Sequence, residues 1–190
     1  MSAVVILAGG KSKRMGLDKL GLFHNGHTLL ESAVSRFSEE FEDVYLSVAD
    51  AAKYPEINAR RIVDIRPGLG PMSGLHASLL SLPEDGVFLV AADLPYSCPL
   101  AAKHLIELCQ DHDACIIRLP DGRLEPLFGY YRKTLLERCE NALESGVNQM
   151  TVLIGCVNTR YVAPCELGPL WDDKLILNVN YPEDYEKLQK

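Results

Sequence analysis

The chain begins with the stretch Ala3-Val4-Val5-Ile6-Leu7-Ala8-Gly9-Gly10-Lys11-Ser12-Lys13-Arg14-Met15-Gly16-Leu17-Asp18-Lys19. Its first six residues are apolar, which predicts a strand over residues 3–8. Gly9 and Gly10 permit a tight turn and a close approach of backbone N–H groups to a phosphate chain, while the cations supply charge-assisted hydrogen bonds. The loop therefore suits the triphosphate of a nucleotide. A solvated basic loop is the alternative that these residues alone leave open.

Beyond this loop, the chain alternates short apolar runs with longer amphipathic stretches. This alternation predicts an α/β fold, in which helices cover both faces of a mostly parallel sheet. The predicted strands are 3–8, 44–48, 61–64, 87–92, 114–118 and 127–131. The predicted helices are 28–40, 73–82, 99–110, 133–144 and a short helix after Pro182. Because no repeat or low-complexity linker interrupts the pattern, we expect a single domain over residues 1–190.

The charge balance excludes some classes of partner. The chain has 190 residues, of which 19 are Lys or Arg and 26 are Asp or Glu, and its net charge is −7. An acidic protein of this kind is not expected to bind nucleic acid or an acidic membrane over a broad surface. No apolar run approaches the roughly 18 residues of a membrane span.

The cysteines point to a reducing compartment. None of the six is spaced as C-x-x-C, so neither a zinc knuckle nor a thioredoxin-like pair is predicted. We expect buried free thiols and a cytoplasmic location.

Five segments together resemble the molybdenum cofactor guanylyltransferases. The first loop has the pattern L-A-G-G-x-S-x-R-M-G-x-D-K of that family. The other four segments, in the order of the family, are Gly70-Pro71-Met72-Ser73-Gly74, Asp93-Leu94-Pro95, Glu125-Pro126-Leu127 and Asn178-Val179-Asn180-Tyr181-Pro182-Glu183-Asp184. The resemblance covers essentially the whole chain. It implies a three-layer, Rossmann-like nucleotidyltransferase fold and an enzyme that transfers GMP from GTP to the phosphate of molybdopterin, with release of pyrophosphate.

The resemblance also assigns roles to residues. Those that it places in the nucleotide site are Leu7, Ala8, Gly9, Gly10, Arg14, Lys19, Ser47, Asp64, Gly70, Pro71 and Asp93. Of these, Arg14, Lys19 and Asp93 are the expected catalytic residues, since the two cations would hold the triphosphate.

The first loop favours GTP over CTP, and the resemblance places Ser47 and Asp64 in contact with the nucleoside. Related cytidylyltransferases have L-A-A-G where this chain has Leu7-Ala8-Gly9-Gly10, and the missing methyl group leaves room for the larger purine. A carboxylate at Asp64 could accept two N–H bonds from the guanine edge. The alternative for Asp64 is a carboxylate that caps the turn after its strand.

Asp93 is the predicted ligand of Mg²⁺. It follows the apolar strand 87–92, and ligands collect at the carboxyl ends of the strands in open α/β sheets. Mg²⁺ is often held by one or two carboxylates together with substrate phosphates. The alternative is that Asp93 only begins the turn through Pro95.

Asn178 and Asn180 are the predicted acceptor-binding residues. They are two positions apart, so their side chains point to one side of an extended segment. The alternative role for Asn180 is to cap the helix that begins at Pro182.

The sequence leaves open alternatives for the identity of the acceptor and for the reaction. Members of the family often carry basic residues near 147–150, whereas this chain reads Gly146-Val147-Asn148-Gln149-Met150. A molybdopterin cytidylyltransferase, a sugar-phosphate nucleotidyltransferase and a non-catalytic nucleotide-binding module therefore remain as rivals. The expected small-molecule partners are GTP and molybdopterin. Other cofactor-biosynthesis proteins and the recipient molybdoenzymes are the expected protein partners.

Overall fold

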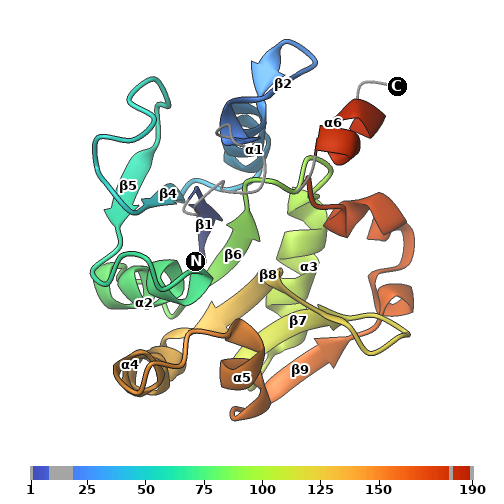
Figure 1. Cartoon of the computed structure of the whole chain (residues 1–190). Helices are drawn as coiled ribbons and strands as arrows, with labels where there is room; N and C mark the ends of the chain where they lie inside the picture. Colours follow the sequence, from blue (N-terminus) through green and yellow to red (C-terminus); the bar gives the residue numbers. More distant parts are fainter. Residues whose placement is uncertain (1, 9–18, 180–181, 189–190) are drawn as a thin grey trace.

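A seven-stranded sheet forms the centre of the molecule. The computed structural model describes residues 2–8, 19–179 and 182–188 (Figure 1). Within these residues, the strands of the sheet are, in spatial order, β5 (Arg60–Val63), β4 (Val44–Val48), β1 (Ala3–Leu7), β6 (Gly86–Ala91), β8 (Leu124–Arg132), β7 (Ala114–Arg118) and β9 (Thr159–Val162). Strand β8 is antiparallel to both its neighbours, whereas the other neighbouring pairs are parallel. The prediction of a mostly parallel sheet is confirmed.

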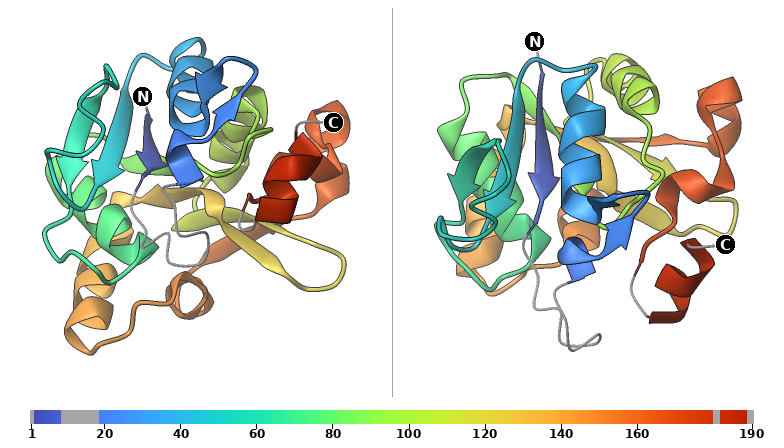
Figure 2. Two further views of the ribbon diagram at one scale, coloured as in Figure 1. Left: turned by 45° about the horizontal axis from the view of Figure 1, so that its top comes forward. Right: turned by 90° about the horizontal axis from the view of Figure 1, so that it is seen from above.

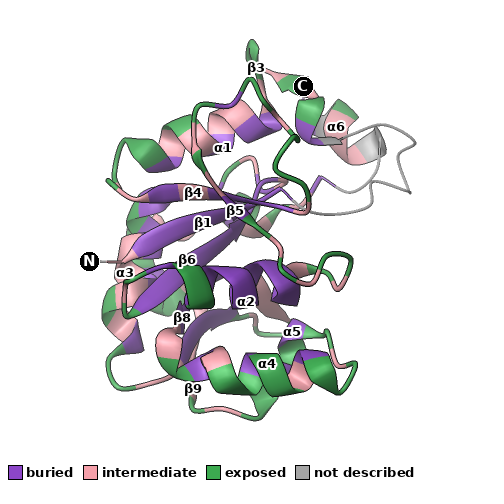
Figure 3. Ribbon diagram, turned by 90° about the vertical axis from the view of Figure 1, so that its left-hand side faces the viewer, coloured by how far each residue is buried: buried purple, intermediate pink, exposed green. Residues whose placement is uncertain are grey.

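Helices cover both faces of the sheet (Figures 1 and 2). Helices α1 (Leu29–Ser38) and α3 (Pro99–Cys109) pack on one face in a core cluster that includes Phe37, Phe88 and Leu105. Helices α2 (Pro71–Ser81), α4 (Leu136–Glu144) and α5 (Met150–Gly155) pack on the other face. Figure 3 shows the buried strands between these two layers. The three-layer architecture expected from the resemblance is confirmed.

A hairpin and a helix cap follow the first loop. After the 3₁₀ turn η1 (Lys19–Gly21), strands β2 (Phe23–His24) and β3 (His27–Thr28) pair through Asn25 and Gly26, both of which have positive φ. Thr28 then caps α1: its hydroxyl accepts the Glu31 N–H, and the Glu31 carboxylate accepts the Thr28 N–H at 2.7 Å. The helix therefore begins where its own sequence satisfies the first N–H groups.

Strand β8 is longer than the predicted strand 127–131. It begins at Leu124 and contains Pro126, which lacks the N–H needed for a regular ladder. The register with β7 shifts at this point, since Ile116 pairs with Gly129 but Ile117 pairs with Glu125. This irregularity accommodates the proline within the strand, so the sequence prediction began the strand too late.

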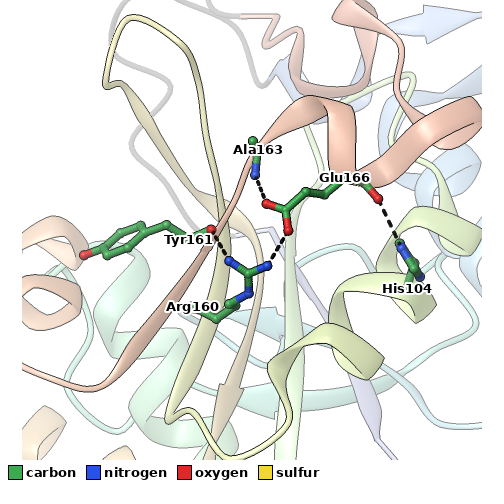
Figure 4. A network of polar contacts seen from close by, with 5 residues as sticks. All are labelled: His104, Arg160, Tyr161, Ala163 and Glu166. Atoms are coloured by element: carbon green, nitrogen blue, oxygen red, sulfur yellow. Dashed lines mark hydrogen bonds and ion pairs between the residues drawn. The ribbon is translucent and has the colours of Figure 1, made fainter.

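The C-terminal third contains elements that the sequence pattern did not predict, namely α5, β9 and the 3₁₀ helices η3 (Pro164–Leu170) and η4 (Asp173–Ile176). A polar network joins β9 to η3 (Figure 4). Glu166 forms an ion pair with Arg160 and accepts the Ala163 N–H at 2.8 Å, and its carbonyl lies 3.3 Å from Nε2 of His104 on α3. These contacts fix the path by which the chain leaves the edge of the sheet and approaches η4 and Asn178.

Burial of the cysteines differs in part from the expectation. All six thiols are free; Cys109, Cys115 and Cys139 are buried, whereas Cys156 and Cys165 are exposed. The expectation of buried thiols was therefore wrong for these two positions. Among the described residues, no helix combines the length and the apolar character needed to cross a bilayer.

Candidate active site

The order of the strands reverses at β1 and β6, whose carboxyl ends lie side by side at one edge of the sheet. From β1 the chain proceeds to β4 and β5 on one side and then returns to form β6 on the other side of β1. In open α/β sheets, such a reversal of strand order leaves a crevice in which ligands bind. The predicted site residues can therefore be located relative to this edge.

Leu7 and Ala8 end the first strand and are bonded into the sheet. The Ala8 N–H donates to the Ser47 carbonyl at 2.9 Å, and the Ala92 N–H donates to the Leu7 carbonyl at 3.2 Å. Both side chains are buried in the core. These two residues thus fix the point from which the following loop departs, while their side chains serve packing.

Ser47 and Asp64 come together at the ends of β4 and β5. The Ser47 hydroxyl donates to Oδ1 of Asp64 at 3.3 Å, and the Asp64 N–H donates to the carbonyl of Val48 at 2.9 Å. Burial raises the pKa of Asp64, while the hydrogen bond from Ser47 lowers it. Because Ser47 is only 2% exposed, it lies behind Asp64 and orients that carboxylate.

Gly70 and Pro71 form the start of helix α2 at the same edge. Gly70 is the N-cap residue with φ of 76°, and Pro71 follows as the first helical residue. No side chain caps the helix and no acidic residue lies in its first turn. The N–H groups and the positive end of the helix dipole are therefore compatible with an anion.

Gly74 allows this helix to approach the strands closely. An added Cβ would lie 2.5 Å from the Ser47 Oγ and 2.7 Å from the Leu7 Cδ2. The first turn of α2 thus packs directly against the residues that hold Asp64 and the end of β1. A side chain at this position would push the helix away from the site.

Asp93 and Glu125 form a pair of carboxylates at the end of β6. Asp93 lies two residues beyond β6, and its carbonyl accepts the N–H of Val179 at 3.0 Å. The pKa of Glu125 is raised to about 6: burial raises it most, the hydrogen bond from the Leu127 N–H opposes this, and the negative charge of Asp93 contributes to the increase. From the sequence, Glu125 was assigned no role of its own and appeared only as part of a motif. The signal that could have identified it is the antiparallel pairing of its strand with the strand that precedes Asp93.

Asn178 lines a cavity of 400 Å³ and directly precedes Val179, whose N–H donates to the Asp93 carbonyl. Its side-chain amide donates to the Ile176 carbonyl at 3.3 Å, and the next residue, Val179, is buried against Leu29 and Leu188. The segment after η4 thus turns Asn178 toward the cavity and Val179 toward the interior. Trp171 and Arg123 also line this cavity, and sequence reasoning did not single them out.

Some predicted site residues lie outside the described part of the chain. These are Gly9, Gly10 and Arg14 in the first loop and Asn180 in the C-terminal segment. Lys19 begins the turn η1, but its side chain also lies outside the described part. The structure brings together Ser47 with Asp64 and Asp93 with Glu125, and Gly70 and Pro71 begin the helix that packs on Ser47.

The fold is that of an open α/β protein, in which polar groups and a helix N-terminus lie at the edge of a mostly parallel sheet where proteins of this class bind their ligands. Comparison with known proteins is more specific. The model of the MobA-like NTP transferase domain matches residues 4–155. The chain belongs to this family, and the predicted nucleotidyltransferase activity class is confirmed.

Two of the similar proteins that bear the name "Probable molybdenum cofactor guanylyltransferase" illustrate the similarity. The one from Peptoclostridium acidaminophilum is 31% identical, over 96% of this chain and 86% of its own length. The one from Carboxydothermus hydrogenoformans is 32% identical, over 98% of this chain and 94% of its own length. A crystal structure of molybdopterin-guanine dinucleotide biosynthesis protein A from Archaeoglobus fulgidus superposes with a TM-score of 0.84 at 25% identity, covering 98% of this chain and 96% of that one.

Proposed function

We propose that this nucleotidyltransferase transfers GMP from GTP to the phosphate of molybdopterin, and that residues 1–190 act as one domain. The observation that supports this most is the convergence of separate motifs on one edge of the sheet. Ser47, Asp64, Gly70, Asp93 and Asn178 come from five parts of the chain and all lie at or beside the carboxyl ends of the strands. The two relatives named above carry the same activity in their names.

In this proposal, the Asp64 carboxylate recognises the guanine base through hydrogen bonds. The carboxylate offers two acceptor oxygens, one of which already receives the Ser47 hydroxyl. A guanine edge presents two N–H donors side by side, whereas cytosine presents one amino group. In this proposal Ser47 acts through Asp64 and does not touch the base itself.

The triphosphate is assigned to the loop after β1 and to the start of α2. Backbone N–H groups of Gly9 and Gly10, with the side chains of Arg14 and Lys19, would bind the phosphates. Gly70 and Pro71 at the N-terminus of α2 would add the field of the helix dipole. This distribution places positive groups on the phosphate side of an otherwise acidic protein.

The carboxylates at the end of β6 fit a divalent cation such as Mg²⁺. Asp93 would hold the ion, and Glu125 adds a second negative charge beside it. Because the described residues contain no group of three His, Cys, Asp or Glu that could enclose a metal, the remaining ligands would be phosphate oxygens and water. Such an ion supplies neutralisation of the phosphate charge when bound.

The reaction requires no nucleophile from the protein. An oxygen of the acceptor phosphate forms a bond to the α-phosphorus of GTP, the bond from this phosphorus to the bridging oxygen breaks, and pyrophosphate leaves with that electron pair. The acceptor is already an anion, so the residues contribute positioning and charge neutralisation. Asn178 and Asn180 would orient the acceptor phosphate, and Arg14 and Lys19 the leaving pyrophosphate.

The surrounding biology follows from the substrates. We propose a cytoplasmic enzyme that takes GTP and molybdopterin as its small-molecule partners. Because the product is a fragile cofactor, the enzyme would receive molybdopterin from, and pass its product to, other cofactor-biosynthesis proteins and the recipient molybdoenzymes.

The test is pyrophosphate release with GTP or CTP, each with and without molybdopterin. We expect release with GTP only when molybdopterin is present, and little release with CTP. Asp64→Asn should reduce the preference for GTP over CTP, because an amide N–H replaces one of the acceptor oxygens. A preference of the unaltered chain for CTP, or release that does not depend on molybdopterin, would overturn the proposal.

A further inference from the structure

None of the residues that line the Asn178 cavity is among those proposed above to bind the base or the triphosphate. The cavity has a volume of 400 Å³ and lies between the β7–β8 hairpin and the segment that runs through η4. Its lining includes Leu119, Arg123, Trp171, Asp173, Ile176 and Asn178. Cavities that bind small organic molecules typically begin at about 300 Å³. The cavity is therefore large enough for a flat ring system of two or three fused rings.

Backbone and side-chain contacts place this cavity next to Asp93. Asn178 lines the cavity, and the N–H of the following residue, Val179, donates to the Asp93 carbonyl at 3.0 Å. On the same side, the Lys174 ammonium lies 5.6 Å from the centre of the Tyr96 ring, in the turn that follows Asp93. A ligand in the cavity would thus have one end beside the proposed reaction centre.

The cavity wall offers a fixed aromatic ring. Trp171 is partly buried and packs against the core together with Leu119 and Ile176. Its indole N–H donates to Oδ1 of Asp173 at 3.1 Å, which orients the ring. An indole held in this way provides a flat surface on which a planar heterocycle can stack.

The polar groups of the wall match the edge of an aminopyrimidinone ring. Arg123 is 70% exposed, and its pairing with Asp121 at 3.9 Å is loose. Its guanidinium is therefore available to donate to carbonyl or anionic groups. Asp173 and Asn178 contribute oxygens that can accept N–H groups.

We propose that this cavity binds the pterin ring system of the acceptor, stacked on Trp171 and held by Arg123, with the acceptor phosphate at the Asn178 end. The inference rests on the proposed function, of which it specifies the second substrate site. It also explains why residues 146–150 contain no cation: the positive charge for the acceptor comes from the β7–β8 hairpin instead.

The test uses the intrinsic fluorescence of Trp171, which is the only tryptophan of the chain. The full chain is titrated with a stable phosphorylated pterin, 6-hydroxymethylpterin phosphate, and the tryptophan emission is recorded. We expect saturable quenching that persists in excess GTP, because the base and triphosphate occupy the other side of the site. Displacement of the pterin by GTP would show that it binds in the nucleotide position and would overturn the inference.

Two arginine variants provide the matched comparison. Arg123→Gln should raise the Kd for the pterin about tenfold, the usual effect of losing one charge-assisted hydrogen bond. Arg138→Gln removes another exposed arginine, from a groove between α4 and α5, and should leave the Kd unchanged. Equal Kd values for the two variants, or the absence of saturable quenching, would contradict the inference.

Activity measurements separate this inference from the proposed function. With GTP and molybdopterin, Arg123→Gln should raise the KM for molybdopterin and leave the KM for GTP unchanged, and Trp171→Phe should disturb the KM for molybdopterin less than Trp171→Ala. Normal turnover with an unchanged KM for molybdopterin in Arg123→Gln would remove the pterin site and leave the proposed function standing. Quenching without any turnover would support the pterin site and contradict guanylyl transfer.

Discussion

Asp93 is fixed by its main chain, so its carboxylate can be changed without loss of the turn. The carbonyl of Asp93 accepts the Val179 N–H, and the preceding N–H, from Ala92, donates to Leu7. We predict that Asp93→Asn and Asp93→Ala lower kcat by at least about 100-fold, because charge stabilisation is lost, while the melting temperature changes little, because the main-chain hydrogen bonds of the turn are unaltered. Pyrophosphate release and thermal unfolding measure the two quantities. Asp111→Asn, an exposed carboxylate after α3, serves as the control, and full activity of Asp93→Ala would remove Asp93 from the mechanism.

Glu125 makes stability depend on pH. Its pKa is raised from 4.5 to about 6 in the folded protein, so the folded state binds a proton that the unfolded state releases between these values. The free energy of unfolding therefore falls as pH rises through this window, by up to about 2 kcal/mol at 1.36 kcal/mol per unit.

The matched variant is Glu125→Gln, in which the amide oxygen can still accept the Leu127 N–H that the carboxylate accepts at 3.2 Å. We predict that the free energy of unfolding of this variant does not show the decrease with rising pH that Glu125 causes. Urea unfolding of both proteins from pH 4.5 to 7, without divalent cations, gives the difference between their free energies of unfolding at each pH. A difference that does not change with pH would contradict the assignment.

At the scale of elements, the close approach of α2 to β1 and β4 depends on Gly74. We predict that Gly74→Ala lowers the free energy of unfolding by about 1–3 kcal/mol and weakens GTP binding, because the new methyl group would displace Ser47 or Leu7. Gly155→Ala, at the end of α5, meets nothing within 4 Å and should be neutral or stabilising. Chemical unfolding and nucleotide titration of the two variants check this. Equal stability of the two would mean that α2 can move without cost.

The same scale shows which elements could be predicted from sequence. Helix α1 could be predicted locally, because Thr28 and Glu31 form a cap at its start that needs no distant partner. Strand β9 has only four residues, with Arg160 among them, and it is a strand because β7 lies beside it. The start of β8 was missed because Pro126 normally ends a strand, and only the irregular pairing with β7 accommodates it.

At the scale of the whole molecule, the order of the strands determines which residues lie together at the candidate site. The positions of Asp64 and Asp93 at the ends of strands could be predicted from sequence, because Asp64 ends one predicted strand, whereas Asp93 follows another and also lies in a motif. The approach of Glu125 to Asp93 and the cavity at Trp171 could not, because they depend on the antiparallel strand β8 and on the path of the chain after β9. Local patterns locate strand ends, whereas contacts between strands and loops require the tertiary structure.

The central claim is that a GMP group moves from GTP to a pterin phosphate. The most direct measurement is to supply GTP labelled at the α-phosphorus together with molybdopterin and to follow the label by chromatography. The account predicts that the label appears in a pterin dinucleotide in amounts equal to the pyrophosphate released. Label that stays in GTP, or that is recovered as free GMP, would contradict it.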